Sequence, residues 1–158
     1  MPLKLTAELI PQTTWYKNLR NSVPKEVWDR IRKECYKMAG HRCEICGTSG
    51  KLNCHEVWEF DNKRNIQRLK RFIALCDLCH DIKHIGLVNV RISKGNLPEN
   101  FIDKLANHFM KVNGVSRAEF DSHCSEVYFL WQERSKKTWH LDFGLFLAAY
   151  KPGQRKLF

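Results

Sequence analysis

Hydrophobic residues recur at helical spacing near the start of the chain. Between Val23 and Met38 they fall at intervals of three and four, which places on one helix face Val27, Trp28, Ile31, Cys35 and Met38. Pro24 stands near the start of this stretch and Gly40 follows its end, as is typical of helix boundaries. We therefore predict an amphipathic helix over residues 23–38, preceded by an irregular arm or a short strand.

The second half of the chain shows the same periodicity twice. The apolar positions are Phe101, Ile102, Leu105, Phe109 and Val112 in one stretch, and Phe120, Cys124, Val127, Tyr128 and Trp131 in the next. Gly114 separates the two stretches, and Ser116 with Glu119 matches a capping box. The pattern predicts helices over residues 101–112 and 117–133. Residues 87–92 (LVNVRI) alternate instead, which predicts a short strand or an extended linker.

The composition is that of a folded and strongly basic chain. Its 158 residues are 43% hydrophobic, enough for one domain with a buried core. The formal net charge of +10 favours a polyanionic partner, most often nucleic acid, and ordinary surface charge is the alternative. The N-terminus lacks the apolar segment of a signal peptide, and no apolar run is long enough to cross a bilayer. We therefore predict a cytoplasmic protein in a reducing compartment, with no membrane partner.

Four of the seven cysteines form two CxxC pairs, Cys43 with Cys46 and Cys76 with Cys79. In a reducing compartment such pairs bind metal more often than they form disulfides. Four thiolates close a tetrahedral structural zinc site, and Gly47 suits the tight turn after the first pair. The spacing predicts a structural Zn²⁺ on these four residues. The other cysteines lack such spacing and are predicted to be core or surface thiols: Cys35, Cys54 and Cys124.

The stretches CEICGTSGKLNCHEVWEF, from Cys43, and FIALCDLCHDIKH, up to His84, contain these pairs. Together they resemble the HNH, or ββα-metal, nucleases that carry a four-cysteine zinc site. The resemblance implies an α+β fold, with a treble-clef-like ββα-metal core and a structural zinc, flanked by an N-terminal helix and a helical C-terminal region. The corresponding segments are residues 1–42, 43–92 and 93–158.

The resemblance also implies a function. It points to a metal-dependent DNA endonuclease that hydrolyses phosphodiester bonds, with double-stranded DNA as its partner. A second hypothesis is a catalytically inactive, zinc-stabilised module derived from the same fold, which binds nucleic acid or another protein. Two departures from the family pattern, described next, motivate this second hypothesis.

The residue roles follow from aligning the family motif on this sequence. The usual Asp-His pair falls on His55-Glu56, so His55 becomes a metal ligand and Glu56 the general base. At its ordinary pKa, Glu56 is ionised at pH 7. An alternative register makes Cys54 the ligand and His55 the base. The resemblance adds His80 as a ligand, and His84, four residues on, as a third ligand or as a residue that orients a ligand or contacts phosphate. The ion would be Mg²⁺, Mn²⁺, Ni²⁺ or Zn²⁺.

The asparagine that usually braces the base is replaced by Arg71, which could instead stabilise charge on the scissile phosphate. Residues 61–71 carry five cations and one acid. Such a run either contacts phosphates or forms the solvent-exposed face of a strand. Residues predicted to contact nucleic acid are Lys63, Arg64, Arg68, Lys70, Arg71 and Lys83. Asp61 or Glu59 could orient a ligand, although an ordinary turn role suits Asp61 equally.

Overall fold

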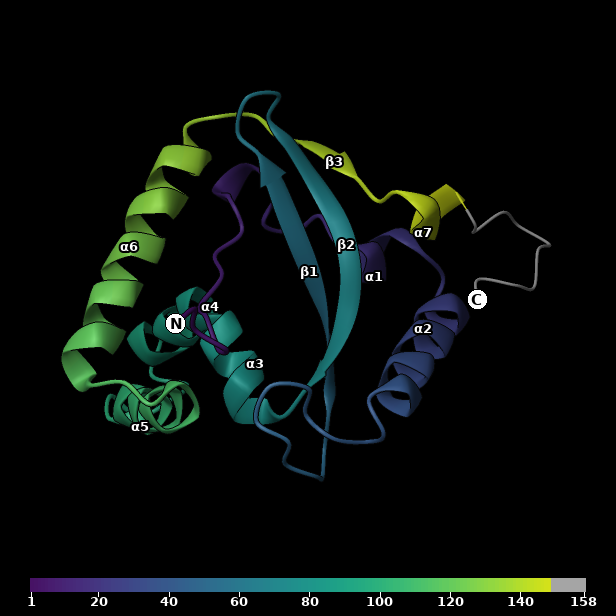
Figure 1. The fold of residues 1–158 in the computed structure, drawn as a ribbon. Coiled ribbons are helices and arrows are strands. Elements are labelled where there is room, and N and C mark those ends of the chain that lie inside the picture. Colours follow the sequence, from purple (N-terminus) through teal and green to yellow (C-terminus); the bar gives the residue numbers. More distant parts are fainter. Residues whose placement is uncertain (149–158) are drawn as a thin grey trace.

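A long antiparallel hairpin runs through the middle of the molecule (Figure 1). Strand β1 (Asn53–Asp61) pairs with β2 (Ile66–Leu75), with a register irregularity between Val57 and Trp58. A short third strand, β3 (His140–Asp142), adds to β2 in parallel. Because the strand order is β1-β2-β3, one side of β1 is a free sheet edge. The candidate site described below lies at this edge.

The computed structural model describes residues 1–148, with side chains up to residue 146; the last ten residues of the predicted segment 93–158 lie outside the described residues. Within residues 1–148, no helix combines the length and the apolar character needed to cross a membrane. The elements besides the strands are η1 (Gln12–Thr14), α1 (Leu19–Ser22), α2 (Lys25–Met38), α3 (Asp77–Lys83), α4 (Ile85–Ser93), α5 (Phe101–Asn113), α6 (Arg117–Ser135) and α7 (Leu145–Ala148).

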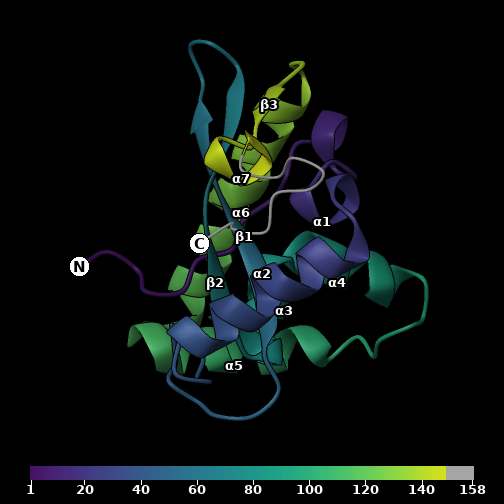
Figure 2. The same cartoon turned by 90° about the vertical axis from the view of Figure 1, so that its right-hand side faces the viewer.

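The helices form two groups on opposite sides of the hairpin (Figures 1 and 2). Helices α1 and α2 cover one side, where Leu19, Val27 and Ile31 form a core with Leu69 of β2. Helices α3 to α6 cover the other side around the larger core, which contains Phe109. The mixed α+β class expected from the sequence is thus confirmed. The larger core draws residues from all three predicted segments, because the N-terminal arm also packs into it.

The N-terminal arm is held against the C-terminal helices by side chains that bond to its backbone. Asn113 at the end of α5 accepts hydrogen bonds from the Lys4 and Leu5 N–H groups, at 2.8 and 3.0 Å, and donates one to the Leu5 carbonyl at 2.9 Å. His123 of α6 accepts from the Ala7 N–H at 2.9 Å, and Trp131 donates to a carbonyl further along the arm. The arm is therefore irregular, as predicted, but is an integral part of the fold.

The helix predictions agree with the structure, with one error. The helices predicted over 23–38, 101–112 and 117–133 correspond to α2, α5 and α6, and the capping box of Ser116 and Glu119 is present. Residues 87–92 are helical, so the predicted strand or linker is wrong. The buried residues of α4 are Ile85 and Val88, while Leu87 is 46% exposed. The alternation within LVNVRI hid a helical face that begins two residues earlier.

We predict that Asn113→Ala loosens the arm. The substitution removes three hydrogen bonds and leaves backbone groups of the fully buried Leu5 without a partner. The expected loss in the free energy of unfolding is about 1–3 kcal/mol, together with faster amide hydrogen exchange at Leu5 and Ala7. Asn100→Ala is the matched control, because Asn100 precedes the same helix, is exposed and makes no side-chain capping bond. Equal exchange rates in the two variants would show that Asn113 does not hold the arm.

Candidate functional site

The four cysteines of the two CxxC pairs come together in space. Cys43 and Cys46 lie in the turn before β1, where the Gly47 N–H donates to the Cys43 carbonyl at 2.9 Å and Gly47 has a φ of 77°. Cys76 precedes α3 and Cys79 lies in its first turn. The four sulfur atoms lie within 4.8 Å of one another and could hold a zinc ion.

The distances and the acidity of these thiols fit such an ion. The Cys46 and Cys76 sulfur atoms are 3.6 Å apart. Sulfur ligands at about 2.3 Å from a tetrahedral zinc are about 3.8 Å apart. Burial raises the pKa of Cys76 to about 11 and that of Cys79 further. Burial also acts on Cys43, but backbone N–H groups of Cys46 and Cys76 outweigh it and lower its pKa to about 7. Four ionised thiols in this space therefore require a compensating cation.

A histidine that the sequence gave no reason to select lies against this cluster. The His108 Nε2 atom, on α5, is 3.2 Å from the Cys79 sulfur. A ring N–H donated to a thiolate stabilises its charge and fixes its position, as partners of metal ligands commonly do. His108 lacks any ligand spacing with other residues, so only the packing of α5 on α3 reveals its place. This contact joins the C-terminal region to the cysteine cluster.

The three histidines predicted to bind a second ion also come together. His55 lies on β1, His80 on α3, and His84 directly after α3, and one ring nitrogen from each lies within 4.8 Å of the others. Burial, with the neighbouring His55, lowers the pKa of His80 to about 4 and that of His84 to about 3. Both rings are therefore neutral near pH 7, and each keeps a nitrogen lone pair for a cation.

The geometry of this cluster fits a small divalent ion. The His55 Nδ1 and His84 Nε2 atoms are 3.1 Å apart. Nitrogen ligands at about 2.0–2.1 Å from a tetrahedral ion are about 3.3 Å apart. Three histidines supply three ligands, which leaves further coordination positions for water or a substrate oxygen. Imidazole ligands favour transition metals such as Zn²⁺ or Ni²⁺ over Mg²⁺.

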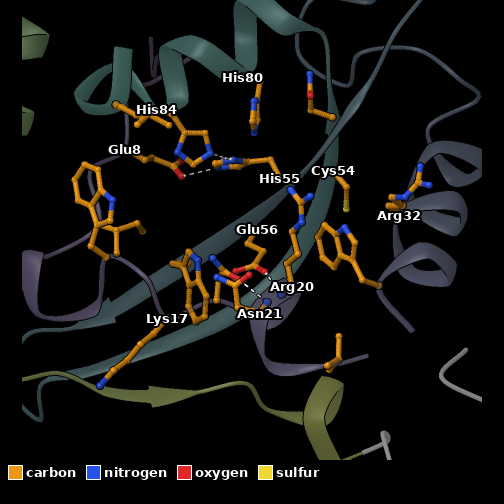
Figure 3. A pocket seen from close by; sticks show the side chains of 18 of the residues that line it. Glu8, Lys17, Arg20, Asn21, Arg32, Cys54, His55, Glu56, His80 and His84 are labelled. Atoms are coloured by element: carbon orange, nitrogen blue, oxygen red, sulfur yellow. Dashed lines mark hydrogen bonds and ion pairs between the residues drawn. The ribbon is translucent and has the colours of Figure 1, made fainter. Parts of the chain in front are cut away.

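Glu8 of the N-terminal arm completes this cluster, although the sequence analysis did not select it. Its Oε2 atom is 3.2 Å from the His55 Nε2 atom (Figure 3). Its Oε1 atom is 2.6 Å from the Lys83 ammonium. Burial alone would raise the pKa of Glu8, but the hydrogen bonds from His55 and Lys83 lower it to about 2. An ionised carboxylate accepts the Nε2 proton of His55, which leaves Nδ1 as the ring atom that faces His84 and can serve as a ligand.

Glu56 lies on the α1 side of β1, and its carboxylate borders the same pocket as the histidines (Figure 3). The Leu19 and Arg20 N–H groups donate to its Oε1 atom at 2.9 and 3.3 Å. Burial raises its pKa to about 7, against the opposing effect of these donors and of a hydrogen bond with Trp58. The ordinary pKa expected from the sequence is therefore wrong, because Glu56 is largely removed from solvent.

Cys54 lies away from the histidine cluster. Its thiol is hydrogen-bonded to that of Cys35 on α2, and it packs against the core on that side of the hairpin. Successive residues of a strand point to opposite faces, so Cys54 cannot join His80 and His84 while His55 does. The arrangement favours the register in which His55 accompanies them. Asp61 accepts hydrogen bonds from the Lys63 and Arg64 N–H groups, which is the turn role considered for it.

The cations predicted to contact nucleic acid lie elsewhere. Lys83 is 5% exposed, and its ammonium group is bonded to Glu8 and Thr6 inside the fold. Arg71 is exposed and lies 3.5 Å from Glu44, beside the cysteine cluster and outside the lining of the pocket. The remaining hairpin cations also lie outside the pocket lining, and three are ion-paired: Arg64 with Asp61, Arg68 with Asp142, and Lys70 with Glu59.

A cavity of about 970 Å³ extends from the histidines toward α1 and α2. Its walls are the N-terminal arm, α1, α2, the free edge of β1 and the start of α4 (Figure 3). Four cations that were not predicted as site residues line this cavity: Lys17, Arg20, Lys25 and Arg32. No local spacing relates these residues to the histidines, because the cavity is formed by segments that are distant in the sequence.

We predict that Cys79→Ala abolishes the structural zinc. The variant should contain one zinc ion per chain fewer than the wild-type protein. It should also lack a cooperative thermal transition, because structural zinc contributes directly to the folding free energy. Zinc content by atomic absorption and unfolding by circular dichroism are the measurements. Cys124→Ala, at a half-buried thiol on α6, is the control and should keep the zinc. A Cys79→Ala protein with the full zinc content would exclude this cluster as the site.

We predict that Glu8→Gln weakens binding of a divalent ion to the histidine cluster by about 10–100-fold, because the amide no longer draws the His55 proton to Nε2. Glutamine keeps the shape of the side chain and an oxygen for Lys83. Titration with Co²⁺ or Zn²⁺, followed by absorption or calorimetry, measures the affinity. Glu99→Gln, at an exposed residue of the loop before α5, is the control. An unchanged affinity in Glu8→Gln would remove Glu8 from the site.

Comparisons with known proteins add no relative for this chain. A scan against protein-family models finds no match, and searches of curated proteins and of solved structures find no significant match.

Proposed function

We propose that this protein is a metal-dependent DNA endonuclease of the HNH type. The observation that carries the proposal is the meeting of His55, His80 and His84 directly beside the four-cysteine cluster, on the succession β1-β2-α3. This is the arrangement that the resemblance of residues 43–86 leads one to expect of a ββα-metal core. His80 and His84 are neutral near pH 7, Glu8 orients His55, and all three residues line the cavity.

In this proposal each residue has a separate task. His55, His80 and His84 hold a divalent ion, which when bound would polarise the scissile phosphate and stabilise the leaving oxygen. Glu8 keeps His55 in the tautomer that presents Nδ1. Glu56 accepts a proton from the attacking water. Because its pKa is about 7, its carboxylate is a stronger base at neutral pH than an exposed one.

The rigid placement of Glu56 supports this assignment. Two backbone N–H groups at the start of α1 hold Oε1, so the carboxylate has a defined direction at the cavity wall. General bases need such positioning, since proton transfer requires hydrogen-bond distance to the water in the reactive complex. Arg20, whose backbone supplies one of these donors, also borders the cavity and could contact the phosphate there in place of Arg71.

One observation favours the second candidate, a zinc-stabilised module that binds without turnover. Glu56 stands where the family has a histidine base, and its bonds to the Leu19 and Arg20 N–H groups also serve to anchor α1 on β1. Arg71 stands in the place of the family's asparagine, yet it bonds to Glu44 rather than bracing the loop beside the histidines. A binding module would retain both clusters and cleave nothing.

We predict nicking of supercoiled plasmid DNA in the presence of Mg²⁺, Mn²⁺, Ni²⁺ or Zn²⁺. His80→Ala should abolish it, and Glu56→Gln should lower the rate about 10²–10⁴-fold, as expected for loss of a general base. Gel electrophoresis of the plasmid forms measures the rate. His140→Ala is the matched control, because His140 is exposed on β3 and outside the cavity lining.

The outcomes separate the two candidate functions. If no metal supports nicking while DNA binding is retained, the protein is a binding module and the endonuclease proposal fails. If His80→Ala cleaves as fast as wild type, the histidine cluster is not the catalytic site. Thermal unfolding of each variant should match wild type, which ensures that a lost activity does not reflect loss of the fold.

A further inference from the structure

The candidate catalytic cluster is recessed rather than presented on a protruding surface. His55 is only 4% exposed, and His80 and His84 are half-buried. The cavity that leads to them is bounded by the arm on one side and by α1 and α2 on another (Figure 3). Protein elements that read an intact duplex enter its grooves, the wider of which is about 12 Å across. Here the reacting strand must instead enter the protein.

The size of the cavity limits what can enter. Pockets of about 300–1,000 Å³ enclose ligands of small-molecule size, and this one is about 970 Å³. That space accommodates one or a few nucleotides and not the two strands of a duplex. Enzymes that act on a recessed site therefore take a single-stranded substrate or extrude a nucleotide from the helix.

The charge lining the cavity suits a phosphate backbone. Lys25 and Arg32 share Asp29, at 2.6 and 2.8 Å, and the Glu8 carboxylate is neutralised by Lys83. Lys17 and Arg20 are exposed to the cavity and make no ion pair with any described residue. Glu56 is the remaining acid of this lining, so the wall at Lys17 and Arg20 carries more positive than negative charge. On the hairpin, in contrast, Arg64, Arg68 and Lys70 already have acidic partners.

Aromatic rings lie among these cations, as in sites that bind single strands. The cavity lining includes Trp15, Trp28, Tyr36 and Trp58. Trp28 is only 9% exposed and belongs to the core beside α2, whereas Trp15 and Trp58 are half-buried. The Trp58 ring is held by an edge contact with Phe143, at a centroid distance of 5.8 Å. Rings held in this way are suited to stacking on an unpaired base, which is sequence-tolerant because every base has a flat face.

We infer that the cavity admits an unpaired DNA strand, with Lys17 and Arg20 contacting its phosphates and Trp15 and Trp58 stacking on its bases. The inference rests on the proposed function for the choice of DNA. It replaces the intact duplex, expected from the resemblance, by a substrate with single-stranded character at the cleavage point. Examples of such substrates are an overhang, a flap, a bubble or a flipped nucleotide.

The first test is binding in the absence of added divalent ions. Fluorescence anisotropy should show a short single-stranded oligonucleotide bound at least about tenfold more tightly than the duplex of the same sequence, which is the gain from one stacked base. Arg20→Ala keeps the backbone N–H that bonds to Glu56. It should reduce the slope of log affinity against log salt by about 0.7, the loss of one phosphate contact. Lys33→Ala removes an exposed cation of α2 outside the cavity lining and should leave that slope unchanged.

The second test is cleavage of a fully paired duplex and of the same duplex with a central bubble, with metal present. Faster cleavage at the bubble supports the inference. Equal affinity for single strand and duplex, or equal cleavage of the paired duplex and the bubble, overturns it while leaving an endonuclease in place. Single-strand preference with the Arg20 effect on the salt slope, but no cleavage with any metal, upholds the binding inference and overturns the proposed function.

Discussion

The geometry of the site depends on the short helix α3, which carries residues of both clusters. Cys76 and Cys79 hold its first turn in the cysteine cluster, and His80 follows at once. An α-helix advances only 1.5 Å per residue, so a rigid first turn fixes the position of His80 and, one turn later, of His84. A structural zinc at the cysteines would thus restrict the histidine positions without touching them. The interaction of α5 with α3, through His108 and Cys79, adds a second restraint on the same turn.

The N-terminal arm and the helices α5 and α6, which lie outside the ββα segment, converge on α3. Lys83 is nearly fully buried, and a buried ammonium group requires a charged partner. Glu8 supplies that partner and also bonds to His55, so the same carboxylate satisfies a structural cation and orients a candidate ligand. The arm that carries Glu8 is held by Asn113 and His123 of α5 and α6. The C-terminal helices, for which the sequence offered no role, therefore act on the site through the arm.

The sequence permitted prediction of those features that depend on local spacing. The two CxxC pairs, the placement of His80 and His84 one turn apart, and the three amphipathic helices each follow from residues close together in the chain. Glu8 and His108 could not be found in this way, because they reach the clusters from segments 47 and 29 positions away from their partners. The run of cations on the hairpin did not reveal which cations lie at the cavity. Its cations are paired by residues such as Asp142 and Glu44, whose proximity depends on the tertiary fold.

The position of β1 at the edge of the sheet explains how His55 and Glu56 can serve one site. Adjacent residues of a strand point to opposite faces, so in the centre of a sheet their side chains would be separated by the sheet itself. At a free edge the cavity can extend around the strand, with α3 on one side and α1 on the other. His55 meets His80 and His84 on the first side, and Glu56 is held by the start of α1 on the second. The edge left open by β1 is therefore the feature that allows a candidate ligand, His55, and the proposed base, Glu56, to be neighbours in sequence.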